Sequence, residues 1–237
     1  MLLGESLAPL TSRIGFLEAP VNEVAKSLRE WLENLRRQVR VTSFEGGLQE
    51  NALRLQPLIS GAAPRDLVVA TRNPRWTAVL DCLYQGGNQV TTVGYLARTM
   101  RVQGLVVSSI SDSRGAPGVP QRFGARQFEL FAPIETDFLN YVRTISVIRE
   151  GERWRFDAAG TVQDFEDEAA YARRKIADRF TEDMLADYCA ALGLHPFDDD
   201  FYPGPSILLE TDEPVPHGAY ALSLAEARRK WGYDARG

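Results

Sequence analysis

The sequence predicts a single α+β domain: a mainly antiparallel sheet with helices packed on one face. Apolar residues recur at helical spacing over residues 20–38, alternate as in strands through much of 65–163, and return to helical spacing within 165–237. Strands that follow one another, with helices grouped before and after them, are typical of α+β folds. No internal repeat or linker divides residues 1–237, so we expect one domain.

The first predicted helix covers residues 20–38. Its apolar residues share one face and its charged residues the other, and Pro20 suits a first helical turn. Residues 39–44 alternate as a short strand, which Gly46 and Gly47 interrupt. The helix therefore lies on the surface with one stripe buried.

Two hairpins are expected in the middle of the chain. Residues 67–71 and 76–83 are apolar runs on either side of a turn at Asn73 and Pro74. Residues 141–149 alternate in one phase, and residues 153–158 return after a glycine turn with their aromatic side chains on one side. Each pair predicts two antiparallel strands.

The stretch between these hairpins combines both kinds of pattern. Helical spacing over 88–100, with Asn88 as N-cap, is followed by a strand over 105–110, so residues 76–110 are consistent with a β-α-β unit. Residues 111–124 are rich in Ser, Gly and Pro and predict a loop or lid. Strand character resumes over 126–131.

The last third of the chain is predicted to be mainly helical. One helix is expected over 167–179 and another from Thr181 to Gly193. A short strand over 207–210 follows, and Ser223 begins a capping box that opens the last helix.

Charge and cysteine content restrict the class of protein. The chain has 32 acidic and 27 basic residues and a net charge of −5, which favours a cationic protein partner over nucleic acid. Its two cysteines, Cys82 and Cys189, have no close second cysteine, which suits a reducing compartment. The first residues lack a signal peptide's basic charge, and no apolar stretch reaches the roughly 20 residues of a membrane span. We expect a cytoplasmic protein that does not interact with membranes.

The densest group of functional side chains follows His195 and Pro196. Three aspartates lie between aromatic rings, and the candidate partner-binding residues are Phe197, Asp198, Asp199, Asp200, Phe201 and Tyr202. Exposed rings and carboxylates are typical of interface anchors. A metal site with His195 is the alternative, but the spacing lacks the alternate ligands and central glycine of a calcium loop, and we predict no metal. Asp198 or Asp199 capping local backbone donors is a further interpretation.

No cofactor is predicted, because the chain lacks a phosphate-binding or dinucleotide motif. Cys82 lies in a predicted strand with no histidine near it in sequence, which favours a structural thiol. Paired-carboxylate hydrolysis stays open: Glu129, with Asp137 or Asp157, supplies the carboxylates, and residues 111–124 supply a lid.

Three segments carry a resemblance: residues 128–131, residues 136–143, and the stretch from Arg179 through Tyr202. Together they resemble a set of bacterial proteins that have no assigned function. The resemblance implies a bacterial, cytoplasmic, single-domain protein, and it carries over no catalytic residue.

These observations lead to three functional hypotheses. The first is a non-enzymatic bacterial binding protein, such as an immunity or antitoxin-like inhibitor of a basic toxin, which docks through residues 197–202. The second is a small-molecule hydrolase that uses Glu129 and Asp137. The third is a structural or regulatory module that oligomerises through its sheet edges.

Overall fold

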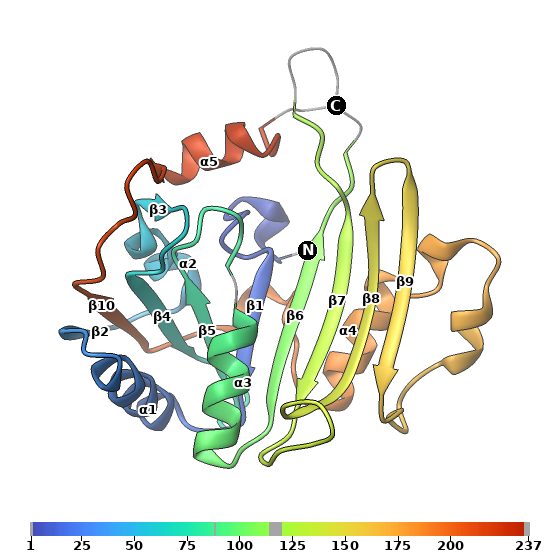
Figure 1. The fold of residues 1–237 in the computed structure, drawn as a ribbon, viewed down its shortest axis with the longest axis horizontal. Coiled ribbons are helices and arrows are strands. Elements are labelled where there is room, and N and C mark those ends of the chain that lie inside the picture. Colours follow the sequence, from blue (N-terminus) through green and yellow to red (C-terminus); the bar gives the residue numbers. More distant parts are fainter. Residues whose placement is uncertain (1, 88, 114–119, 235–237) are drawn as a thin grey trace.

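The computed structural model describes residues 2–87, 89–113 and 120–234. A nine-stranded antiparallel sheet runs through the centre of the molecule, and helices lie against both of its faces (Figure 1). The predicted α+β class with a mainly antiparallel sheet is confirmed. No helix in these described ranges has the length and apolar character that crossing a bilayer requires.

The strands of the large sheet are, in spatial order, β2 (Val39–Phe44), β10 (Ser206–Thr211), β4 (Arg65–Ala70), β5 (Thr77–Asp81), β1 (Arg13–Leu17), β6 (Gly104–Ile110), β7 (Ala125–Phe131), β8 (Tyr141–Glu150) and β9 (Arg153–Gly160). A small sheet pairs β3 (Leu58–Ile59) with β11 (Ala221–Leu222). The α-helices are α1 (Val21–Asn34), α2 (Leu48–Asn51), α3 (Gln89–Met100), α4 (Glu182–Ala191) and α5 (Leu224–Lys230).

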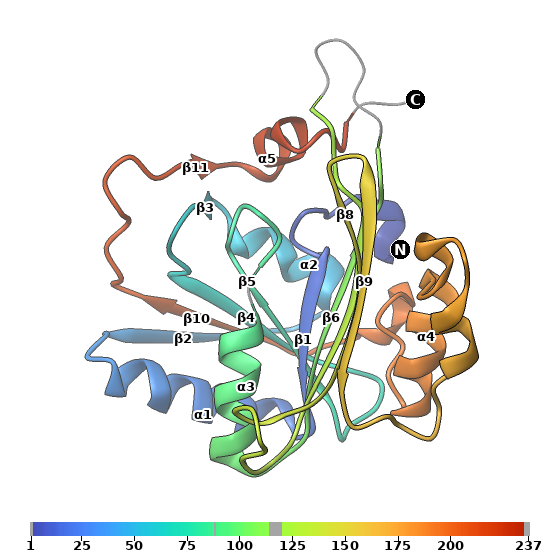
Figure 2. The same ribbon diagram turned by 45° about the vertical axis from the view of Figure 1, so that its right-hand side comes forward.

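Helices α1 and α3 cover one face of the sheet, which we call the α1–α3 face. The apolar core there includes Leu17, Val68, Val79, Val106 and Leu209. The opposite face carries a larger core beneath the N-terminal segment and α2, α4 and α5. Figure 2 shows α3 and α4 on opposite sides of the sheet.

The prediction of helices on one face only was therefore wrong. The central strands explain the difference, because consecutive residues of β4 and β5 are buried and point alternately to the two faces. Such strands need apolar cover on both sides.

The predicted β-α-β unit is present as β5, α3 and β6. Strand β1 pairs antiparallel with both β5 and β6, so these two strands are parallel to each other with β1 between them. Strand β1, residues 13–17, is not among the elements that the sequence predicts. The proposed N-cap, Asn88, lies outside the described residues.

Two glycines let α3 lie close to the sheet. A Cβ atom at Gly15 of β1 would come 2.6 Å from Cγ2 of Val93, and one at Gly104 of β6 would come 2.7 Å from Cγ1 of the same residue. Both distances are shorter than van der Waals contact. Helix α3 thus sits over β1 and β6 only because these two positions have no side chain.

Cover of the α1–α3 face ends beyond α3. Along β8 the residues that point to the opposite face are mostly buried, whereas those on the α1–α3 face are half-buried. Along β9 the residues on the α1–α3 face, including Asp157, are exposed. Over β8, β9 and residues 127–129 of β7 this face is therefore only partly buried or exposed, and Figure 1 shows α1 and α3 displaced from β8 and β9.

Both predicted hairpins are confirmed. Strand β4 pairs antiparallel with β5, and β8 with β9. The predicted strands over 39–44 and 207–210 correspond to β2 and β10, and Thr181 and Ser223 cap α4 and α5 through their side chains.

The other helix predictions need correction. Helix α1 ends at Asn34 instead of residue 38, because the chain turns to a left-handed conformation at Arg36, where φ is 62°. Residues 167–179 form two 3₁₀ turns, Glu168–Ala172 and Ile176–Asp178, instead of an α-helix. Side-chain contacts fix this segment, among them the hydroxyl of Tyr171, which donates to Glu166 at 2.8 Å.

The close approach of α3 predicts a specific response to Gly15→Ala. The added methyl group overlaps Val93, so the free energy of unfolding should fall by about 1–3 kcal/mol. Combining it with Val93→Ala removes the nearest atom, so the double variant should lose less stability than the sum of the two single variants. Urea denaturation of the four proteins measures this coupling. Additive losses, or no loss for Gly15→Ala, would contradict the packing described.

Candidate functional site

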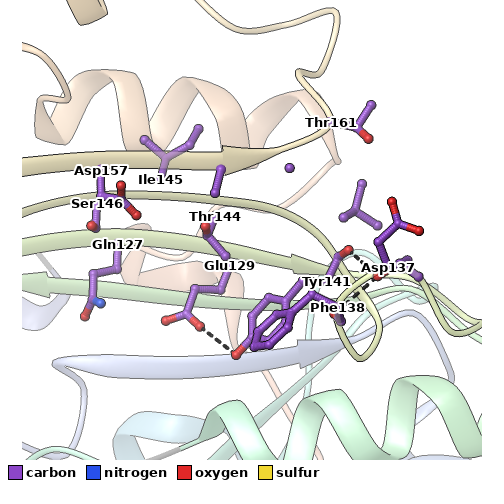
Figure 3. Close-up of a pocket in the computed structure, with 14 residues that line it drawn as sticks. Gln127, Glu129, Asp137, Phe138, Tyr141, Thr144, Ile145, Ser146, Asp157 and Thr161 are labelled. Atoms are coloured by element: carbon purple, nitrogen blue, oxygen red, sulfur yellow. Dashed lines mark hydrogen bonds between the residues drawn. The ribbon is translucent and has the colours of Figure 1, made fainter.

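A groove of about 690 Å³ lies on the open part of the α1–α3 face (Figure 3). Strands β7, β8 and β9 form its floor, and the loop between β7 and β8 forms one end. Alternation along the strands brings the polar side chains to the same side. Its polar and aromatic lining residues are Gln127, Glu129, Thr136, Asp137, Phe138, Tyr141, Thr144, Ser146, Asp157 and Thr161.

The groove carries three carboxylates. Glu129 comes from β7, Asp157 from β9, and Asp137 from the loop after β7. Sequence analysis had named these residues as candidate acid–base partners, and the structure brings them to one groove. Glu129 and Asp157 are two strands apart, roughly 10 Å laterally at the usual strand spacing. That separation is too large for the two carboxylates to share a proton.

Glu129 is the least solvated of the three. Desolvation raises the pKa of the Glu129 carboxyl above its ordinary value, and this effect outweighs the opposing effects of Arg13 and Tyr141. The hydroxyl of Tyr141 donates to Oε2 of Glu129 at 3.5 Å (Figure 3), and burial raises the pKa of Tyr141 as well. A partner that supplies positive charge would therefore stabilise the ionised form of Glu129.

Arg13 approaches the groove from β1. Its Nη2 donates to Oε1 of Gln127 at 3.0 Å and its Nε to Oγ of Ser108 at 2.8 Å. These two partners are neutral, and the guanidinium acts on Glu129 through space. Among the described lining residues of the groove there is no lysine, arginine or histidine.

Two aromatic rings form a platform beside the carboxylates. Phe138 and Tyr141 are stacked, with ring centroids 5.7 Å apart and planes inclined by 22°. Phe138 is 70% exposed, which is unusual for a large apolar side chain. Such rings attract a cation placed over their faces and pack against the alkyl stem that carries it.

The predicted docking loop is only partly on the surface. Asp198, Asp199 and Asp200 are exposed and Phe197 is half-buried. Phe201 and Tyr202 belong to the core, and the hydroxyl of Tyr202 donates to the carbonyl of Pro196 at 2.9 Å. The expectation that these two rings face a partner needs correction, because they anchor the loop to the sheet instead.

The aspartates make local contacts. Oδ1 of Asp198 accepts from the backbone N–H of Asp200 at 2.9 Å, as the capping interpretation predicted, and Asp200 pairs with Arg72 at 3.5 Å. No cluster of three or more metal-ligating side chains is found in the described ranges. Docking through these aspartates stays a prediction.

The remaining candidates lie away from the groove. Residues 114–119 of the predicted lid are outside the described part of the chain, and its flanking residues 111–113 and 120–124 do not line the groove. Cys82 is buried, and desolvation raises the pKa of its thiol to about 12, which disfavours the reactive thiolate.

The neutral part of the groove is not predicted by the sequence. Gln127, Thr144 and Ser146 share the phase of Glu129 on adjacent strands, in the registers Glu129–Thr144 and Gln127–Ser146. The alternation along each strand indicates that these residues share a face within their own strand. Their position beside Glu129 follows only from the pairing of β7 with β8.

The environment of Glu129 predicts how stability depends on pH. Its carboxyl has a raised pKa in the folded state, so its contribution to stability is present below the unfolded pKa of about 4 and is lost as pH rises through the folded pKa. Glu129→Gln cannot ionise, so the variant does not lose stability in this way as pH rises. The unfolding free energy of the variant, relative to the natural protein, should therefore increase across that window in urea titrations.

Tyr141→Phe provides the matched test. It removes a hydrogen bond that favours the ionised carboxyl, so the same pH transition should move to higher pH. Identical pH profiles for the natural protein and Glu129→Gln would mean that Glu129 is not desolvated.

No protein-family model, curated protein or solved structure matches this chain, so the resemblance to bacterial proteins stays a prediction.

Proposed function

We propose that the protein is a non-enzymatic binding protein that holds a cationic segment of a protein partner in the groove over β7, β8 and β9. The observation that carries this proposal is the composition of the groove. Glu129, Asp137 and Asp157 converge on it, and its described lining contains no basic side chain.

Electrostatics favours a cationic partner at two length scales. The net charge of −5 attracts it from a distance, which speeds association. Within the groove, the desolvated Glu129 carboxyl becomes easier to ionise when a positive charge arrives beside it. The groove therefore stabilises a guanidinium or ammonium group and repels an anion.

The shape of the groove favours an extended segment. Its floor is one face of three antiparallel strands, and β9 is the edge of the sheet. A segment lying there can place one arginine or lysine near Glu129 and pack its alkyl stem on Phe138. An enclosed pocket of the kind that surrounds most of a small substrate is not required.

The hydrolase hypothesis receives less support from this geometry. Glu129 and Asp157 are held on strands that are not adjacent, and Asp137 is exposed on a loop. Among the described residues, no hydrogen bond joins any two of these three carboxylates. The groove offers separate anionic contacts and not a coupled acid–base pair.

Titration with a short arginine–glycine peptide tests the proposal. Glu129→Gln combined with Asp157→Asn should weaken binding by roughly tenfold or more, since each lost charge-assisted contact is expected to contribute about 1 kcal/mol or more. Binding of the natural protein should also weaken as salt is added. Isothermal titration calorimetry measures both effects, and a glutamate–glycine peptide serves as the negative probe.

The chain offers a matched control in the acidic loop. Asp199→Asn combined with Asp200→Asn changes the net charge by the same amount at a site outside the groove. This variant should keep almost the full affinity. If the loop variant loses affinity and the groove variant does not, docking occurs through residues 198–200 and the proposed site is wrong.

A further inference from the structure

Two aspartates face each other on the α1–α3 face, outside the groove. Asp66 of β4 and Asp81 of β5 are direct partners in the antiparallel register. The backbone N–H of Cys82 donates to the carbonyl of Arg65 at 3.1 Å, so the neighbouring Asp66–Asp81 pair is of the non-hydrogen-bonded kind. Side chains in such a pair lie close together, with Cβ atoms about 4.5–5.5 Å apart.

The two aspartates line a separate cleft of about 720 Å³. Part of its wall comes from the end of α1 and the first turn of α3, which contribute Trp31, Thr91 and Thr92. Loops contribute Ala62 and Gln85. The cleft therefore combines hydroxyl and amide groups with apolar surface around the carboxylates.

The two carboxylates are held differently. Oδ1 of Asp81 accepts from the backbone N–H of Leu83 at 2.9 Å, and Oδ2 accepts from Nε2 of Gln89 at 2.8 Å. Asp66 is only 5% exposed, and no hydrogen bond from a described residue reaches its carboxyl group. A buried, unpartnered acid that lines a cavity is costly unless something else satisfies it.

Charges around Asp66 do not provide that partner. Arg37 lines the cleft, but its Nη2 is engaged with Oε1 of Glu213 at 2.7 Å. Arg13, also in the wall, is hydrogen-bonded to Ser108 and Gln127. Burial first, and then the charge of Asp81, raises the pKa of the Asp66 carboxyl well above its ordinary value, with Arg37 opposing and Glu213 reinforcing the shift.

We propose that this cleft is a second ligand site, which binds the protonated amine of a small monocationic molecule between Asp66 and Asp81. Thr91 and Thr92 offer further acceptors for the ammonium N–H groups, and Trp31 offers surface for an alkyl stem. Arg13 and Arg37 in the same wall repel a second positive charge. The site therefore selects a monoamine over a polyamine.

A proton and the amine compete for the Asp66 carboxyl, because burial and the charge of Asp81 raise its pKa. Affinity should therefore rise with pH through the range in which Asp66 loses its proton. Asp81, Arg37 and Glu213 act on the charge of Asp66, and Arg13 lines the same cleft. The inference goes beyond the proposed function, since it concerns a different cavity and a different class of ligand.

Titration with n-butylammonium, followed by tryptophan fluorescence and by calorimetry in two buffers of different ionisation enthalpy, tests the site. The natural protein should bind the amine with net proton release and should bind 1-butanol and 1,4-diammoniobutane more weakly. Asp66→Asn, an isosteric and neutral change, should weaken amine binding by roughly tenfold or more. Asp81→Asn should do the same.

Glu129→Gln separates this site from the groove, because it should leave amine binding unchanged while it weakens binding of the arginine–glycine peptide. Circular dichroism confirms that each variant is folded. The inference is overturned if the amine does not bind, if 1-butanol binds equally well, or if folded Asp66→Asn binds the amine as the natural protein does.

Discussion

Incomplete helical cover of one sheet face is the constraint on which the groove depends, and the cleft lies where the end of α1 and the start of α3 meet over the same face. Helices α1 and α3 bury the α1–α3 face only over part of its width, and α3 is held there by the absence of side chains at Gly15 and Gly104. Where cover ends, the strands change from apolar to polar. The observed registers place polar residues opposite one another on adjacent strands from Arg13 onward, in the order Arg13, Ser108, Gln127, Ser146 and Asp157.

Arg13, at the start of this polar row, lies between the acidic cleft and the acidic groove. Asp66 lies in the cleft on one side of Arg13, and Glu129 lies in the groove on the other. Desolvation raises the pKa of both carboxyls, and Arg13 opposes this effect at Glu129. Carboxyls that burial destabilises are those whose environment a cationic ligand improves most. Burial of these carboxyls thus costs the fold some stability on this face, which a cation bound as proposed would restore.

The elements that the sequence predicted well are those fixed by local pattern. Alternation and turn residues were sufficient for the β4–β5 and β8–β9 hairpins. Strand β1 was not predicted because it is short and contains Gly15. The role of this glycine depends on helix α3, which passes over it. Phe201 and Tyr202 looked exposed because they adjoin aspartates, yet neighbouring residues of one loop point to opposite environments. Asp66 and Asp81 are equally distant from the predicted turn at 73–74, which is consistent with their pairing. Only the observed register shows that they face each other.

The central claim is that the polar, uncovered part of the α1–α3 face binds cations, while the acidic loop after α4 does not. Backbone amide NMR spectra, recorded while the arginine–glycine peptide is added, test it most directly. The account predicts that the resonances that move most belong to Gln127, Glu129, Thr144 and Asp157, on the floor of the groove. Shifts concentrated at Asp198, Asp199 and Asp200, with the strand resonances unchanged, would contradict it.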